Sequence, residues 1–190
     1  MNRRDFLRTA GIAAGAATVA GTTVATSQDV PQKQSFKLKY APHFGMFENH
    51  AGKDFVDQIN FMADVGFRAF EDNGMKGRPV NVQEKIAAAM ANRGVEMGVF
   101  VANSINWREP TLTTGKKDIL DAFIKDIKES VEVAKRVNAK WMTVVPGFVD
   151  MRLHPDYQRA NVIEALRRGA EIFEPHGLVM VLEPLNFFNH

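Results

Sequence analysis

Acidic side chains follow the short apolar runs of this sequence, at the points where the strands of a parallel sheet would end. Glu183 comes directly after the apolar run Val179 to Leu182, and Glu71 comes after Phe67 to Phe70. A carboxylate that is buried must be paired or bound to a ligand, because an isolated buried charge is costly. Glu183 has almost no polar neighbours in the sequence, so a functional role is favoured for it.

Glu71 and Asn186 are candidates for contact with a small substrate, and a structural role stays open for each. Glu71 could contact a substrate hydroxyl, or it could form an ion pair with Arg68 or Arg78. Asn186 could donate a hydrogen bond to a substrate, or it could brace the loop that follows Glu183.

His43 and Trp107 are two further candidates for the lining of a pocket. His43 follows Pro42 and could line a pocket or be an ordinary loop histidine. Trp107 lies in a polar loop, where it could form an aromatic platform for a sugar ring or cover the rim of the fold.

The elements that would position these residues alternate between short strands and amphipathic helices. Hydrophobic periodicity and glycine stops predict both kinds of element. The expected strands cover residues 36–41, 67–70, 95–101, 141–145 and 178–182, and the expected helices cover residues 53–65, 81–92, 116–137 and 155–175. In the third helix, Lys125 to Glu129 is expected to form a solvated face. Strands that alternate with helices indicate an α/β fold with a parallel sheet and right-handed crossovers.

A (β/α)8 TIM barrel fits this pattern better than a doubly wound open sheet. A dinucleotide-binding sheet normally has a Gly-rich turn after its first strand, but the sequence there is Pro42 to Phe47, with no such motif. A barrel instead gathers functional groups at the C-terminal ends of many strands. A full barrel needs eight strands and about 250 residues, so we expect a barrel truncated after about five units. A complete five-stranded open sheet stays as the alternative.

The first 27 residues are predicted to be an export signal. Arg3, Arg4 and Arg8 precede an uncharged run rich in Ala, Gly and Thr, which is the layout of a signal peptide. The paired arginines followed by Phe6-Leu7 resemble a twin-arginine (Tat) signal. This predicts recognition by the Tat translocation machinery, a periplasmic or secreted location, a linker at residues 28–35 and a folded domain at residues 36–190. The run is too mild for a stable membrane span, although an uncleaved anchor is an alternative.

Charge and composition exclude several classes of function. The chain has 24 basic and 22 acidic residues, and residues 28–190 alone hold 21 of each. This neutral domain offers little support for nucleic-acid binding, which requires a cationic surface. Cysteine is absent, which excludes disulfides and thiolate chemistry. Neither a Walker sequence nor a G-x-S-x-G motif is present.

The segment Val181-Leu182-Glu183-Pro184-Leu185-Asn186 resembles the fifth-strand signature of the hydroxypyruvate isomerase family, within the xylose isomerase-like barrels. The stretch Gly66 to Glu71 is similar to the second strand of that family, which ends in an acid, and the similarity extends over residues 36–190.

This resemblance implies a metal-dependent isomerase or epimerase of a small sugar or hydroxy-keto acid. A divalent metal (Mg²⁺, Mn²⁺ or Zn²⁺) would be bound by acids and an imidazole or amide at the barrel mouth, and protons would move through an enediolate. Glu183 matches one metal ligand and acid–base position. The other ligands belong to later strands, so the 190 residues alone are expected to be inactive, and their open strand edges favour self-association as a homo-oligomer.

Two other functions stay open from the sequence. One is an exported, non-catalytic sugar-binding or degenerate barrel that keeps the pocket without the metal. The other is a metal-dependent nuclease similar to endonuclease IV, which would be expected to have more histidines at the strand ends and a basic face.

Overall fold

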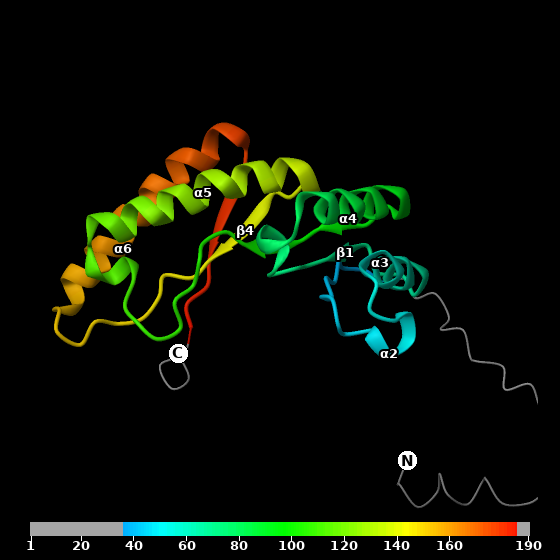
Figure 1. The fold of residues 1–190 in the computed structure, drawn as a ribbon, viewed down its shortest axis with the longest axis horizontal. Coiled ribbons are helices and arrows are strands. Elements are labelled where there is room, and N and C mark those ends of the chain that lie inside the picture. Colours follow the sequence, from blue (N-terminus) through cyan, green and yellow to red (C-terminus); the bar gives the residue numbers. More distant parts are fainter. Residues whose placement is uncertain (1–35, 186–190) are drawn as a thin grey trace, which may run out of the picture. The chain divides into compact units, whose positions relative to one another are not determined.

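The computed structural model describes residues 36–185, which are the coloured ribbon in Figure 1. The predicted signal peptide, the linker and Asn186 lie outside the described residues. The α-helices are α2 (Glu48–Ala51), α3 (Phe55–Asp64), α4 (Val80–Arg93), α5 (Lys117–Val137) and α6 (Pro155–Phe173). The strands are β1 (Ala69–Phe70), β2 (Glu96–Met97), β3 (Val99–Val101), β4 (Trp141–Val144) and β5 (Val179–Leu182), and three short 3-10 helices are η1 (Met75–Gly77), η2 (Leu112–Thr114) and η3 (Glu174–His176).

The helices begin and end close to their predicted positions, for reasons that are visible in the sequence. The Asp54 side chain accepts hydrogen bonds from the backbone N–H groups of Val56 and Asp57 and caps α3, as expected for an aspartate before a helix. Gly94 ends α4 in the left-handed conformation, which glycine adopts without a steric penalty. Pro155 occupies the first turn of α6, where its missing N–H group costs nothing.

The strands follow one another in space in the order of the chain, and all pairings are parallel. β1 pairs with β2, β3 with β4, and β4 with β5. A backbone bridge between His43 and Glu71 adds the first segment beside β1. A doubly wound sheet reverses its strand order at a switch point, and no reversal occurs across residues 36–185. The predicted fold is therefore confirmed: these are about five consecutive units of a TIM barrel.

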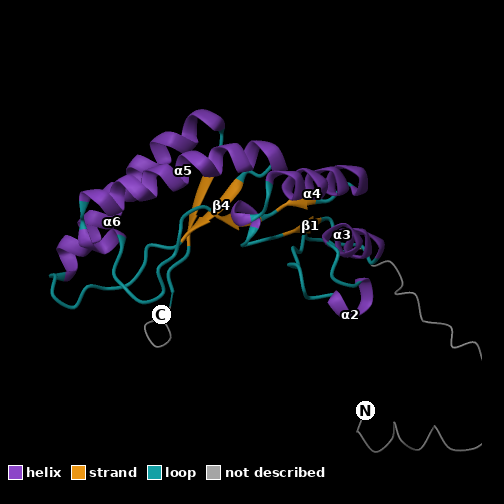
Figure 2. Cartoon of the chain, in the orientation of Figure 1, coloured by secondary structure: helices purple, strands orange, loops and turns teal. Residues whose placement is uncertain are grey.

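The helices lie together along the strands, as right-handed crossovers in a sequential sheet require. α4 contacts α5, and α5 contacts α6; Figure 2 shows α5 and α6 side by side along β4. Between helices and strands lies a core of fully buried side chains, which includes Phe70, Phe100, Ile127, Met142 and Phe173. Each such side chain contributes roughly 2 kcal/mol through the area removed from water.

The strand expected over residues 36–41 does not form. Leu38 and Tyr40 are exposed, and this segment contacts its neighbours through side chains. The Phe36 ring stacks on Phe67 at 4.9 Å, and Lys39 Nζ lies 2.6 Å from Glu96 Oε1. Backbone pairing begins only at Pro42, whose carbonyl accepts a hydrogen bond from the Glu71 N–H at 3.0 Å. The alternation of apolar and polar residues is typical of a strand. A strand also needs a neighbouring backbone to pair with along its whole length, and residues 36–41 have none.

The expected strand over residues 95–101 is present but is divided at Gly98 into β2 and β3. Met97 and Phe100 are both buried, and this spacing of three residues breaks the two-residue alternation of a regular strand. Gly98 still donates a hydrogen bond to the Phe70 carbonyl at 2.7 Å, and a side chain here would lie 3.0 Å from that oxygen. The extra residue has the character of a β-bulge, and it allows one segment to pair with β1 and then with β4.

β5 is less buried than its apolar sequence predicts. Val181 and Leu182 are 37% and 48% exposed, although both belong to the apolar run. The reason is that, within residues 36–185, β5 pairs only with β4. Residues 36–185 also contain no helix with the length and apolar character that a membrane crossing needs.

Candidate functional site

A cleft of about 610 Å³ lies where the strands end, at the edge predicted to carry the functional groups. Several consecutive units contribute to its walls. The lining comes from the turn at 73–77, the end of β3 and the loop at 103–107, the inner side of α5, Val145 after β4, and Glu183 with Leu185 after β5. In a barrel these strand ends converge on one rim, so segments distant in sequence form one surface.

Glu183 lies in this cleft, as the exit of β5 predicted. Its backbone N–H donates to the Val144 carbonyl at 3.0 Å, which continues the pairing with β4 by one residue. Met180 packs toward Gly169 of α6, and alternation along the strand turns Val181 and Glu183 to the opposite side, away from the helices. The carboxylate is exposed, and it forms no ion pair with any other residue between 36 and 185.

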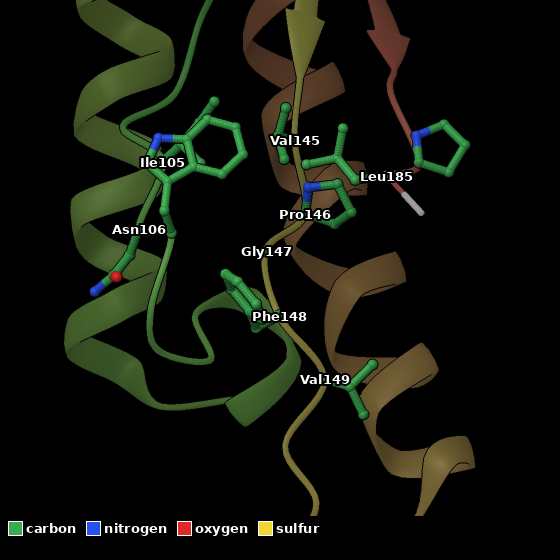
Figure 3. Close-up of a pocket in the computed structure, with 10 residues that line it drawn as sticks. Ile105, Asn106, Val145, Pro146, Gly147, Phe148, Val149 and Leu185 are labelled. Carbon is green, nitrogen blue, oxygen red and sulfur yellow. The ribbon is translucent and has the colours of Figure 1, made fainter. Parts of the chain in front are cut away.

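Trp107 lines the same cleft and also a second, smaller one of about 150 Å³. Figure 3 shows Ile105 and Asn106 on one side of this smaller cleft and Leu185 on the other, with the segment from Val145 to Val149 between them. Most of this lining is apolar. Trp107 is 51% exposed, and its role as an aromatic platform for a sugar ring stays a prediction.

His43 and Glu71 are brought together, but they do not line either of these clefts. Their backbones form a parallel bridge, and His43 is exposed, with its Nδ1 atom 2.8 Å from the Phe44 carbonyl oxygen. The alternative of an ion pair between Glu71 and Arg78 is wrong, because Arg78 instead binds Asp72. A substrate-binding role for His43 and Glu71 stays a prediction.

Asn103 is held by the backbone at the strand ends. Its side-chain amide donates to the Val145 carbonyl at 2.9 Å and its amide oxygen accepts from the Val145 N–H at 3.0 Å. The Asn103 side-chain amide therefore takes the place of a backbone peptide group in the hydrogen-bond ladder between β3 and β4. A polar residue at a strand exit can thus serve the sheet as well as a ligand.

An ion pair between Lys76 and Asp126 forms one wall of the cleft, and it was not found from the sequence. The two residues are 50 positions apart, and Asp126 was expected on the solvated face of its helix. Its side chain is only 17% exposed, so that expectation is wrong for Asp126. Lys125 and Glu129 do lie on the solvated face, where they form an i,i+4 ion pair at 3.9 Å. Burial raises the pKa of Asp126, but hydrogen bonds from Lys76 and from the Ser104 N–H outweigh it and hold this pKa below its ordinary value.

The charge of the cleft is negative on balance. Lys76 is the one cation in the described lining, and it is already bound to Asp126 and lies 3.6 Å from Glu129. Glu183 adds a further carboxylate. Without a bound cation, an uncharged polar ligand fits this lining better than an anion does.

The described residues do not fit a complete metal centre. No group of three His, Asp or Glu side chains within residues 36–185 lies close enough together to hold an ion. Glu183 alone could supply an oxygen ligand at the rim.

Comparison with known proteins agrees with the fold. The family profile described as xylose isomerase-like TIM barrel matches residues 59–190. A search of curated proteins found no significant match.

Solved structures with the same fold include enzymes with different chemistry. An AP endonuclease of family 2 from Brucella melitensis has 18% identity and a TM-score of 0.65, with coverage of 78% of this chain and 55% of that one. D-psicose 3-epimerase from Clostridium cellulolyticum H10, with D-tagatose, has 16% identity and a TM-score of 0.64, with coverage of 80% and 54%. The 3-keto-D-glucoside 4-epimerase of E. coli has 23% identity and a TM-score of 0.59, with coverage of 79% and 57%. The chain thus spans about half the length of the structures it matches.

Proposed function

Because the chain belongs to the xylose isomerase-like TIM-barrel family, we propose that the whole protein isomerises or epimerises a small sugar or hydroxy-keto acid. The substrate class would be that suggested by the resemblance to hydroxypyruvate isomerases. The observation that carries this proposal is the position of Glu183: an exposed carboxylate at the end of β5, in a cleft that Trp107 also lines.

Glu183 would act as the base in an enediolate route. The carboxylate removes a proton from the carbon next to a carbonyl, and the C–H electron pair forms the C=C bond while the carbonyl oxygen takes the negative charge. Return of the proton to the former carbonyl carbon, with a proton shift between the two oxygens, gives the isomer. Return to the original carbon from its other face gives the epimer and requires a second acid.

Trp107 and its apolar neighbours would bind the carbon face of the substrate. A sugar presents C–H groups on one face and hydroxyls at its edges, so a cleft with an aromatic wall and polar groups suits it. His43, Glu71 and Asn186 would add contacts to hydroxyl groups.

A divalent metal (Mg²⁺, Mn²⁺ or Zn²⁺) is part of the same proposal, with Glu183 as one oxygen ligand. When bound, such an ion polarises a carbonyl. Residues 36–185 do not complete its coordination, so we assign to the Glu183 carboxylate only the removal of the proton from the substrate carbon, and we expect no turnover from the 190 residues by themselves.

Export is the final part of the proposal. Residues 1–27 would act as a signal read by the Tat machinery and direct the domain to the periplasm or the exterior. The support for this is the Arg3-Arg4-Asp5-Phe6-Leu7 motif before an uncharged run.

A substitution of Glu183 tests the catalytic proposal. In the whole protein with saturating divalent metal, Glu183→Gln keeps the shape of the side chain but removes the base, so kcat should fall by about 10²–10⁴-fold. The measurement is turnover of ketoses and hydroxypyruvate, together with deuterium uptake from D₂O at the exchanging carbon. Glu171→Gln, on the exposed surface of α6, is the matched control.

The same experiment separates the alternatives. Binding of a sugar without deuterium uptake in the wild-type protein would instead indicate a non-catalytic sugar-binding barrel. Full activity of the Glu183→Gln variant would contradict the role of Glu183.

A further inference from the structure

We propose that Lys76 and Asp126 are positioning residues that hold the loop of Trp107 over the cleft. In this arrangement their ion pair joins three segments: η1, the end of β3 and helix α5. The proposal concerns the placement of a cleft wall, and it does not depend on the reaction that the cleft performs.

The first step is the contact of the pair with the strand end. Lys76 Nζ binds the Asp126 carboxylate and also donates to the Ala102 carbonyl at 3.1 Å. The same carbonyl accepts a hydrogen bond from Ser130 Oγ at 2.8 Å. The side chains of Lys76 and Asp126 are 19% and 17% exposed, and a pair so protected is less screened by solvent than a surface pair.

The second step is the contact of the pair with the loop. The other oxygen of Asp126, Oδ2, accepts a hydrogen bond from the Ser104 N–H at 2.7 Å, three residues before Trp107. A charged acceptor makes this bond stronger than a neutral one. Lys76 fixes one oxygen of the carboxylate and Ser104 uses the other. The ion pair therefore restrains the loop immediately after Asn103, whose own side chain is held by Val145.

The far end of the loop is held independently. Thr111 Oγ1 donates to the Pro146 carbonyl at 3.3 Å, and Thr113 Oγ1 donates to the Phe148 carbonyl at 2.7 Å. Between the two ends, the Asn106 side chain accepts from the N–H groups of Arg108 and Glu109. The loop is therefore restrained at both ends and shaped by a turn in the middle, and loss of the Asp126 contact would free the end nearer to Trp107.

Tryptophan fluorescence can test this, because the chain contains only two tryptophans. In a Trp141→Phe background Trp107 is the sole reporter. Lys76→Met removes the charge but keeps an unbranched side chain, and we expect a red shift of Trp107 emission and stronger quenching by acrylamide. Lys117→Met, which removes the exposed pair with Asp121 on the same helix, is the matched control and should change neither quantity.

A second reporter separates loop movement from general loosening. In a Trp107→Phe background, Trp141 of β4 should be unaffected by Lys76→Met. Lys76→Arg should restore the wild-type behaviour of Trp107. If Lys76→Met does not fold, the same fluorescence measurements are made on Asp126→Asn, because the amide keeps the volume of the side chain and removes its charge. Unchanged emission and quenching of Trp107 in a folded variant, or equal changes at both tryptophans, would overturn the proposal.

Discussion

At the scale of single residues, position in the fold decides which acids are available for chemistry. Glu183 and Asp126 both line the cleft, yet only Asp126 is engaged by partners in the described chain. Its two oxygens bind Lys76 and the Ser104 N–H. We therefore assign a structural role to Asp126, whereas the exposed Glu183 carboxylate is available to bind a ligand.

The lowered pKa of Asp126 makes a prediction for the pH dependence of stability. A carboxyl whose pKa is lower in the folded than in the unfolded protein stabilises the fold fully above the unfolded value, near 3.8. This contribution is lost as the pH falls through the folded value. Asp126→Asn should lower the free energy of unfolding by about 1–3 kcal/mol at pH 7.

Urea unfolding of both proteins between pH 7 and pH 2.5 measures this difference. The difference should shrink below about pH 4, because the wild-type protein also loses the ion pair there. Glu129 lies near Lys76, so Glu129→Gln is the necessary control. A difference that stays constant down to the lowest pH would contradict the assignment.

At the scale of elements, the loop after β3 and the loop after β4 approach each other closely at Gly147. Gly147 has a φ of 94°, and a Cβ atom there would lie 2.0 Å from Thr111 Oγ1. Thr111 in turn donates to the Pro146 carbonyl. A side chain at position 147 must therefore displace the Thr111 hydroxyl from its hydrogen bond to Pro146, or move apart the two loops.

Gly147→Ala tests this fit. We expect a loss of about 2–4 kcal/mol in the free energy of unfolding, which combines the positive φ with the clash. Gly177→Ala is the matched control, because Gly177 has a φ of 66° and nothing lies near its Cβ position, so it should cost only about 1 kcal/mol. Equal losses in urea unfolding of the two variants would show that the close approach to Thr111 is unimportant.

At the scale of the whole molecule, the charge of the described cleft favours the proposed function over that of a nuclease. Residues 28–190 carry equal numbers of basic and acidic residues, and the cleft contains Glu129 and Glu183 beside a lysine that is already paired. A DNA backbone would meet carboxylates there and little free positive charge. A shared barrel fold with an AP endonuclease does not supply the surface that such an activity needs.

We therefore expect no specific affinity for DNA. Fluorescence anisotropy with a duplex that contains an abasic site should show at most weak binding at about 150 mM salt, comparable to an intact duplex. The matched measurement at about 50 mM salt reports any non-specific contact. Tight binding with a preference for the abasic site would instead favour the nuclease.

The sequence alone was sufficient for the fold class, for four helices and for the exit of β5 at Glu183, because these depend on local patterns. These local signals include apolar periodicity, Asp54 before α3 and Gly94 after α4. Each depends on a few neighbouring residues, so it can be recognised without knowing which distant segments the element contacts. The segment Val181 to Asn186 similarly indicated a xylose isomerase-like barrel, the family whose profile matches residues 59–190.

Only the tertiary structure decided which residues meet across the chain. It showed that residues 36–41 lack a ladder, that Gly98 divides a strand, that Arg78 binds Asp72, and that Lys76 reaches Asp126 fifty positions away. His43 and Glu71 were placed together but outside the lining of the cleft. The physical reason is that hydrogen bonds and ion pairs between distant segments depend on strand register and helix rotation. Both are set by packing of the whole core, and neither can be predicted from a single segment of the sequence.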